Sequence, residues 1–141
     1  GEPIEKGRVR NGIGMLVVCL FVGFALSTMI GMHRMKDLRS RVAYAISETR
    51  ELRNKMTEFH DVEKRWPDAM EMGVADFNPY PDGGGYRLQP DGSVVISFSV
   101  LPELKARSIT FTPTPGDAGH FDWVCTADAE IERRYLPGSC R

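Results

Sequence analysis

The stretch Ile13–Met32, IGMLVVCLFVGFALSTMIGM, is twenty residues long and contains no charged side chain. An α-helix rises about 1.5 Å per residue, so this stretch would be roughly 30 Å long, the thickness of the hydrocarbon core of a bilayer. The apolar core of a secretory signal peptide is shorter, roughly 7–15 residues. Length and composition therefore predict a membrane-spanning helix.

The helical pattern continues past this apolar run as an amphipathic segment that extends to about His60. Apolar positions recur there at alternating steps of four and three, which places them on one helix face. The end is predicted at Trp66-Pro67, because the residue before a proline disfavours helical geometry. Together the two segments predict one helix of about fifty residues, roughly 75 Å long. The core stripe consists of Leu38, Val42, Ala45, Leu52, Met56 and Phe59, with Thr49 at the intervening position and Ile46 beside it.

Three acid–base pairs support the same helix, since the acid precedes the base by four residues in each. Each such pair stabilises an isolated helix by about 0.2–0.5 kcal/mol. The core stripe is long enough for a coiled-coil seam, but we expect it to cover a sheet formed by the rest of the chain. The three pairs are Asp37/Arg41, Glu51/Lys55 and Asp61/Arg65.

Within the apolar run, Gly23, Ser27 and Gly31 stand four residues apart and share one helix face. Small residues at this spacing allow a second membrane helix to approach closely, which favours helix packing through this face. Glycine is also frequent in membrane helices without such a role, so both interpretations stay open. Cys19, in the middle of the run, is interpreted as an inert small apolar residue rather than a lipidation site.

Strand patterns follow the helix after a loop over residues 68–85 that is rich in proline and glycine. Pro90-Asp91-Gly92 is a turn sequence between the first two strands. Antiparallel strands with one apolar face need a cover, and the core stripe can supply it. The predicted fold class is therefore α+β, with the long N-terminal helix packed on a single antiparallel sheet of about four strands. The predicted strands are Tyr86–Gln89, Ser93–Val100, Arg107–Thr112 (closed by Pro113 and Pro115) and His120–Thr126.

Cys125 and Cys140 lie in a turn-rich C-terminal region, with fourteen residues between them. They either form a disulfide or remain free thiols; we expect the disulfide, which would stabilise the fold by roughly 3 kcal/mol in the loop-entropy model. Paired cysteines need an oxidising compartment, so the domain would lie outside the cytosol. The predicted organisation is a cytoplasmic stub over 1–12, a transmembrane half-helix over 13–32 and an extracytoplasmic domain over 33–141.

No residue pattern in the sequence indicates catalysis or a cofactor. The histidines His33, His60 and His120 are far apart and lack metal-ligand spacing. A zinc site formed by His120, Cys125 and Cys140 would lack a fourth ligand. The formal net charge of −1 gives no general reason to expect binding to nucleic acid. We therefore expect no enzyme activity, no catalytic residue, no metal and no cofactor.

The assembled features resemble a type IV pilin: an apolar N-terminal helix with an amphipathic second half, a loop, an antiparallel sheet and a C-terminal cysteine loop. The segment Arg41–Pro67 resembles the pilin stalk that ends at an aromatic residue and a proline. The tail is more specific. Trp123-Val-Cys125, followed by Tyr135-Leu136-Pro137-Gly-Ser-Cys140-Arg141, is similar to the pilin ending of Trp-x-Cys, a variable loop, Tyr-Leu-Pro and Cys-Arg. The resemblance covers about residues 15–141.

The head of the sequence departs from the family pattern. Type IV pilins resemble one another most in a glycine before the cleavage point, a phenylalanine after it, and a glutamate four residues later. Here Gly7 is followed by Arg8-Val9-Arg10-Asn11-Gly12, with neither an aromatic nor an acidic residue. The difference favours an alternative: an uncleaved, pilin-derived, single-pass accessory subunit of a larger membrane complex, for example a respiratory one.

The resemblance implies a non-enzymatic protein that serves as a structural or accessory subunit of a type IV pilus or a related filament or secretion system. It implies a single pass through the bacterial inner membrane with the C-terminal domain in the periplasm, or assembly into an extracellular filament. The partners would be membrane lipid and, through the transmembrane helix, either further copies of the chain or subunits of another complex. A DNA-uptake role would need a basic patch; only Arg133, Arg134 and Arg141 cluster, so nucleic acid is not expected.

Overall fold

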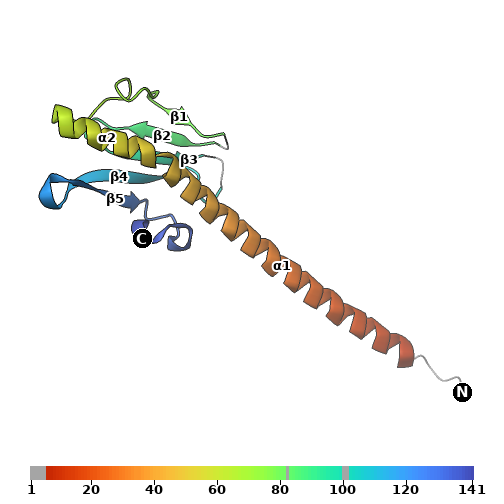
Figure 1. Cartoon of the computed structure of the whole chain (residues 1–141). Coiled ribbons are helices and arrows are strands. Elements are labelled where there is room, and N and C mark those ends of the chain that lie inside the picture. The colour runs from red at the N-terminus through yellow and green to blue at the C-terminus, as the bar shows by residue number, and fades with distance from the viewer. Residues whose placement is uncertain (1–5, 82, 100–101) are drawn as a thin grey trace, which may run out of the picture. The chain divides into compact units, whose positions relative to one another are not determined.

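The structure, a computed structural model, describes residues 6–81, 83–99 and 102–141. The chain divides into two compact units, Gly1–Asp37 and Leu38–Arg141. The predicted α+β fold class is confirmed, and Figure 1 labels α1, α2 and the strands β1 to β5. In chain order the helices and strands are α1 (Lys6–Glu48), α2 (Arg50–Glu63), β1 (Asn78–Pro79), β2 (Gly85–Leu88), β3 (Val94–Phe98), β4 (Arg107–Pro115), the short helix η1 (Asp117–Gly119), β5 (Phe121–Ala127), η2 (Arg133–Tyr135) and η3 (Gly138–Cys140).

The first unit is the N-terminal part of α1. Every described side chain from Gly12 to Asp37 is exposed, including large apolar ones such as Phe21 and Phe24. By length and composition this helix is able to cross a membrane, with a mean hydropathy of 2.5 over an 18-residue window of which no part is buried. Helix α1 starts at Lys6, before the predicted start at Ile13, and residues 1–5 of the predicted stub lie outside the described residues.

The sheet of the second unit contains five antiparallel strands in the order β1-β2-β3-β4-β5. Each strand pairs with its neighbour in sequence, so the connections between strands run over short distances. The sequence predicts about four strands, and all four are present. Strand β1 is additional; it has two residues and therefore no alternating pattern by which it could be predicted.

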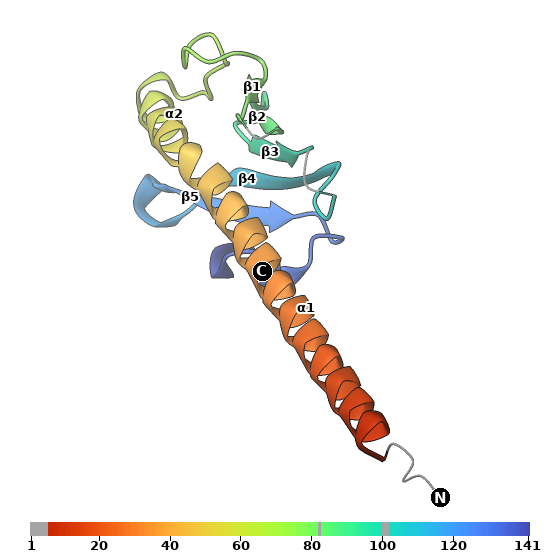
Figure 2. The same ribbon diagram turned by 90° about the vertical axis from the view of Figure 1, so that its right-hand side faces the viewer.

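The core lies between one face of this sheet and the helix that runs along it (Figures 1 and 2). Strand β3 alternates between buried and half-buried residues, as expected for a strand with one apolar face packed. Among the core-stripe residues Phe59 is half-buried and the other five are buried. The buried members from the helix are Leu38, Val42, Ala45, Leu52 and Met56, and those from β3 and β4 are Val94, Ile96, Phe98, Ile109 and Phe111.

The helix is interrupted at Thr49, where the sequence predicts none. Thr49 is a turn residue between α1 and α2, and its side chain is fully buried. Helix α2 then ends at Glu63, because Lys64 adopts a left-handed conformation with φ of 58° and donates its backbone N–H to the carbonyl of His60 at 2.9 Å. This end comes three residues before Pro67 could impose one.

Strand β4 is longer than predicted, since it continues through Pro113 to Pro115. Proline lacks a backbone N–H, and each residue of a central strand donates its N–H to the neighbour on one side or the other, so the sequence predicts a strand end there. Beyond Phe111, however, β4 pairs only with β5, and Pro113 stands opposite Trp123. A proline is compatible with this part of the strand because only one neighbour has to be bonded.

Candidate functional site

The apolar segment 13–32 presents Gly23, Ser27 and Gly31 on an uninterrupted stretch of α1. All three are exposed, and a Cβ built at Gly23 or Gly31 would meet nothing within 4 Å. Nearby, the Thr28 hydroxyl donates to the Ala25 carbonyl at 2.9 Å, so this polar group is bonded within the helix itself. This face of the helix is exposed and contacts no other part of the described chain. Helix packing through these small residues stays a prediction.

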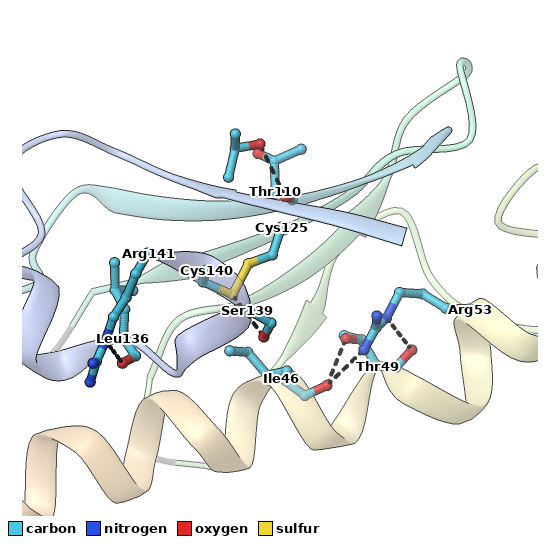
Figure 3. The surroundings of a disulfide bond; sticks show 10 residues. Ile46, Thr49, Arg53, Thr110, Cys125, Leu136, Ser139, Cys140 and Arg141 are labelled. Atoms are coloured by element: carbon cyan, nitrogen blue, oxygen red, sulfur yellow. Dashed lines mark hydrogen bonds between the residues drawn. A yellow bond between two sulfur atoms is a disulfide. The ribbon is translucent and has the colours of Figure 1, made fainter. Parts of the chain in front are cut away.

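A disulfide joins Cys125 of β5 to Cys140 of η3, with a Cα–Cα distance of 4.9 Å (Figure 3). Because both sulfur atoms are bonded to each other, they are not available as thiolate ligands, and the zinc alternative considered for these cysteines is wrong. His33 and His120, two of the three histidines, are exposed. Within the described ranges no three His, Cys, Asp or Glu side chains gather as a metal site would require.

The tail between the cysteines is part of the core. Four of its residues are at most 6% exposed, although short 3-10 turns carry no periodicity that would have predicted their burial. Arg141 donates from Nε to the carbonyl of Leu136 at 3.0 Å, which fastens the end of the chain to the loop (Figure 3). The buried residues are Ile131, Tyr135, Leu136 and Cys140.

Aromatic side chains form a cluster at the end of α2. The ring of Trp66 lies 4.5 Å from that of His60, 5.0 Å from Phe121 and 5.8 Å from Trp123, measured between centroids. Gly92, with φ of +87°, lies under the indole; a Cβ there would come within 2.4 Å of the Trp66 ring. The cluster joins the loop after α2 to strand β5, and it accounts for the third histidine as a packing residue.

A cleft of about 470 Å³ lies beside this cluster, lined in part by Arg65, Asp68, Asp76 and Gln89. Two of these lining residues bond Glu71 in the turn that follows α2. Glu71 accepts a hydrogen bond from Arg65 Nη1 at 2.8 Å and another from the backbone N–H of Asp68 at 3.0 Å. These two bonds lower the pKa of Glu71 from its ordinary value of 4.5 to about 2. Arg65 thus pairs with Glu71 and the predicted pair with Asp61 is wrong.

The remaining charge predictions fare differently. Glu51 and Lys55 form the expected pair at 2.8 Å, on the exposed side of α2. In the basic tail, Arg134 pairs with Glu132, and the Arg141 guanidinium is bonded to a backbone carbonyl. Acidic side chains therefore stand beside the basic ones in this tail, which is not the uninterrupted basic patch that nucleic-acid binding favours.

The buried side of α2 carries a polar residue that sequence reasoning missed. Arg53 is 9% exposed and lies over the Phe111 ring, with Cζ 3.8 Å from the ring centroid. Burial, with a smaller contribution from Arg50, lowers the pKa of Arg53. The available signal was its spacing, because Arg53 follows Thr49 by four residues and thus falls on the same helix face.

A helix that is apolar in its first half and amphipathic in its second, with the second half packed on a disulfide-closed antiparallel sheet, defines a class of structural proteins that are anchored by a helix. Residues 38–141 match the family model for pilin, the subunit of a bacterial filament, and the chain therefore belongs to the pilin family. The matched residues coincide with the second compact unit and leave the apolar segment outside the match. A search of curated proteins found no match to the chain.

Membership in this family makes the chain a pilin-like filament protein, whose assembly involves further copies or other pilus subunits. The family is structural in general rather than catalytic. The apolar N-terminal helix agrees with membrane anchoring.

Proposed function

We propose that the chain is a structural or accessory subunit of a type IV pilus or a related filament or secretion system. Residues 13–32 would anchor it in the bacterial inner membrane by a single pass, with 1–12 in the cytoplasm and 33–141 in the periplasm. The observation that carries the proposal is the family match over the whole sheet-containing unit, joined in sequence to an exposed apolar helix.

The disulfide supports this orientation. Cys125 and Cys140 are bonded in a unit that follows the apolar segment, and structural disulfides persist in oxidising compartments such as the periplasm. Cys19, in the apolar segment, is a free thiol. A protein with the opposite orientation would expose the paired cysteines to the reducing cytosol.

We propose no catalytic role. The cleft beside Trp66 contains carboxylates and an arginine, but Arg65 and Glu71 bond each other and Glu71 also caps the turn at Asp68. No triad of metal ligands is present in the part of the chain that the structure describes. The family's structural role is the simpler account of the same residues.

In the membrane, the proposed contact face is Gly23, Ser27 and Gly31, with lipid around the rest of the helix. Packing in lipid depends on close approach, so Gly23→Leu should weaken assembly with the partner helix. Val22→Leu is the matched control, since Val22 is exposed and already bulky. Unchanged assembly in Gly23→Leu, measured by crosslinking in native membranes, would remove this face from the proposal.

One observation favours the alternative of an uncleaved accessory subunit of a larger membrane complex, for example a respiratory one. Gly7 is followed by basic residues and lacks the phenylalanine and glutamate that type IV pilins carry there. The glutamate that, by resemblance, neutralises the amino terminus of a neighbour in a filament is therefore missing at this position. The helix of this chain would instead pack laterally against other subunits.

Purification from native membranes in mild detergent separates the two proposals. Copies of the chain together with other filament proteins, and loss of surface filaments when the chain is deleted, are expected for the pilus subunit. Fixed stoichiometry with an integral complex would contradict it and support the accessory subunit. Intact-mass measurement of the same sample tests processing, because removal of residues 1–7 would contradict the uncleaved subunit.

A further inference from the structure

We propose that Thr49, Arg53 and Thr57 form a latch that holds the junction between α1 and α2 closed while Arg53 rests on the sheet. The three residues stand four apart, so they share the face of the helix that is turned towards β4 and β5. They all belong to the compact unit Leu38–Arg141. The inference does not depend on whether the chain forms filaments.

The junction is held by side chains. The carbonyl of Ile46, near the end of α1, accepts a hydrogen bond from Thr49 Oγ1 at 3.0 Å and another from Arg53 Nη2 at 3.4 Å. Arg53 Nε donates to the carbonyl of Thr49 at 3.3 Å. One guanidinium in α2 thus bonds a carbonyl of α1 and the carbonyl of the junction residue (Figure 3).

The same guanidinium is held by the sheet. Its Cζ atom lies 3.8 Å from the centroid of the Phe111 ring in β4 and 5.9 Å from the Trp123 ring in β5. No carboxylate among the described residues pairs with Arg53, so carbonyl groups and aromatic faces are what compensates its buried charge. The contacts that stabilise the charge are therefore the contacts that hold the junction.

Thr57 connects the next turn of α2 to strand β5. Its hydroxyl accepts a hydrogen bond from Trp123 Nε1 at 3.2 Å and donates one to the carbonyl of Arg53 at 3.0 Å. Hydroxyl groups that bond carbonyls one turn back are known to loosen and bend helices. With such bonds at Thr49 and at Thr57, the helix around Arg53 depends on the sheet for its geometry.

An apolar residue of the same length would fill this position without the cost of burying a charge. What only arginine supplies is a planar group that can reach two carbonyls and stack on a ring at once. If Arg53 leaves Phe111, both carbonyls lose this donor and the junction can open locally while the apolar residues on either side, Ala45 and Met56, remain packed.

Amide hydrogen exchange of the full chain in detergent micelles tests the latch. In Arg53→Met, loss of the donors to the two carbonyls should speed exchange of the amides at 49–53 by roughly tenfold to a hundredfold. Amides of β3 should change much less. Arg53→Lys keeps the charge but reaches only one carbonyl, so its acceleration should be intermediate. Arg50→Met is the matched control, because Arg50 is exposed on the same helix, and its exchange should match wild type.

A second variant covers the case in which Arg53→Met does not fold. Thr49→Val keeps the buried shape and removes only the hydroxyl donor to Ile46, so a smaller acceleration confined to the junction is expected. Acceleration that is uniform over the domain, or junction amides that exchange as in wild type, would overturn the proposal. Uniform acceleration would show that Arg53 is an ordinary core residue.

Discussion

The apolar segment 13–32 and the amphipathic segment 38–59 are both helical, but their surroundings differ completely. In the first, every side chain is exposed; in the second, Val42 and Met56 are fully buried against the sheet. Local hydrogen bonds form the helix in both segments. A uniformly apolar surface needs an apolar medium on all sides, whereas a periodic one needs a single partner on one side. The same secondary structure is thus apolar on all sides in the first segment and apolar on one packed side in the second.

The largest expected effect is on the free energy of unfolding, when one large apolar side chain in each segment is replaced by alanine. Met56→Ala should lower the free energy of unfolding of the domain by roughly 2–5 kcal/mol, because a fully buried side chain leaves a cavity. Leu20→Ala should leave it nearly unchanged, since Leu20 makes no core contact. Denaturation of the full chain in detergent, followed by the fluorescence of Trp66 and Trp123, measures both. Equal losses in the two variants would contradict the distinction.

The next prediction concerns the disulfide, which belongs to the buried side of the comparison. Replacing Cys125 and Cys140 by serine should cost about 3 kcal/mol, since the loop between them is no longer closed in the unfolded chain. The same fluorescence measurement gives the value, and Cys19→Ser is the control because Cys19 is an exposed free thiol. A double variant as stable as wild type would show that burial of the tail residues suffices without the bond.

In the apolar segment, a charge should act on insertion rather than on folding. Leu20→Arg places a guanidinium near the middle of the predicted span, at a cost of about 2.5–3.5 kcal/mol for insertion. The chain should shift from the membrane fraction towards the soluble fraction, while the domain keeps its unfolding transition. Lys55→Arg, on the exposed face of α2, is the charge-preserving control. Full retention in the membrane would argue against 13–32 as the spanning segment.

The smallest effect is a dependence on pH at the turn after α2. The pKa of Glu71 in the folded protein is about 2, below its ordinary value of 4.5, so its stabilising contribution is complete above pH 4.5 and is lost as the pH falls towards 2. Glu71→Gln should therefore be less stable than wild type at neutral pH, and the difference should vanish near pH 2. A difference that persisted at pH 2 would assign the effect to the shape of the turn.

Several features of this protein follow from the sequence because a short-range pattern determines them. Twenty uncharged residues predict the apolar segment, and steps of four and three predict which side of the next segment is buried at Leu38, Val42 and Met56. The alternation in β3 predicts its buried face in the same way. These patterns reflect regular backbone periods, which neighbouring residues reveal without knowledge of the fold.

Other features depend on partners that are distant in sequence, and only the tertiary structure decides them. The interruption at Thr49 is compatible with the fold because Arg53 bonds the carbonyls there and lies on Phe111. Pro113 is accommodated in β4 because β3 begins opposite Phe111 and does not reach it. Arg65 pairs with Glu71 rather than Asp61 because the turn after α2 brings the Glu71 carboxylate close to it. Each of these features departs from what the local sequence pattern predicts. In each case a contact with a residue outside that pattern stabilises the departure.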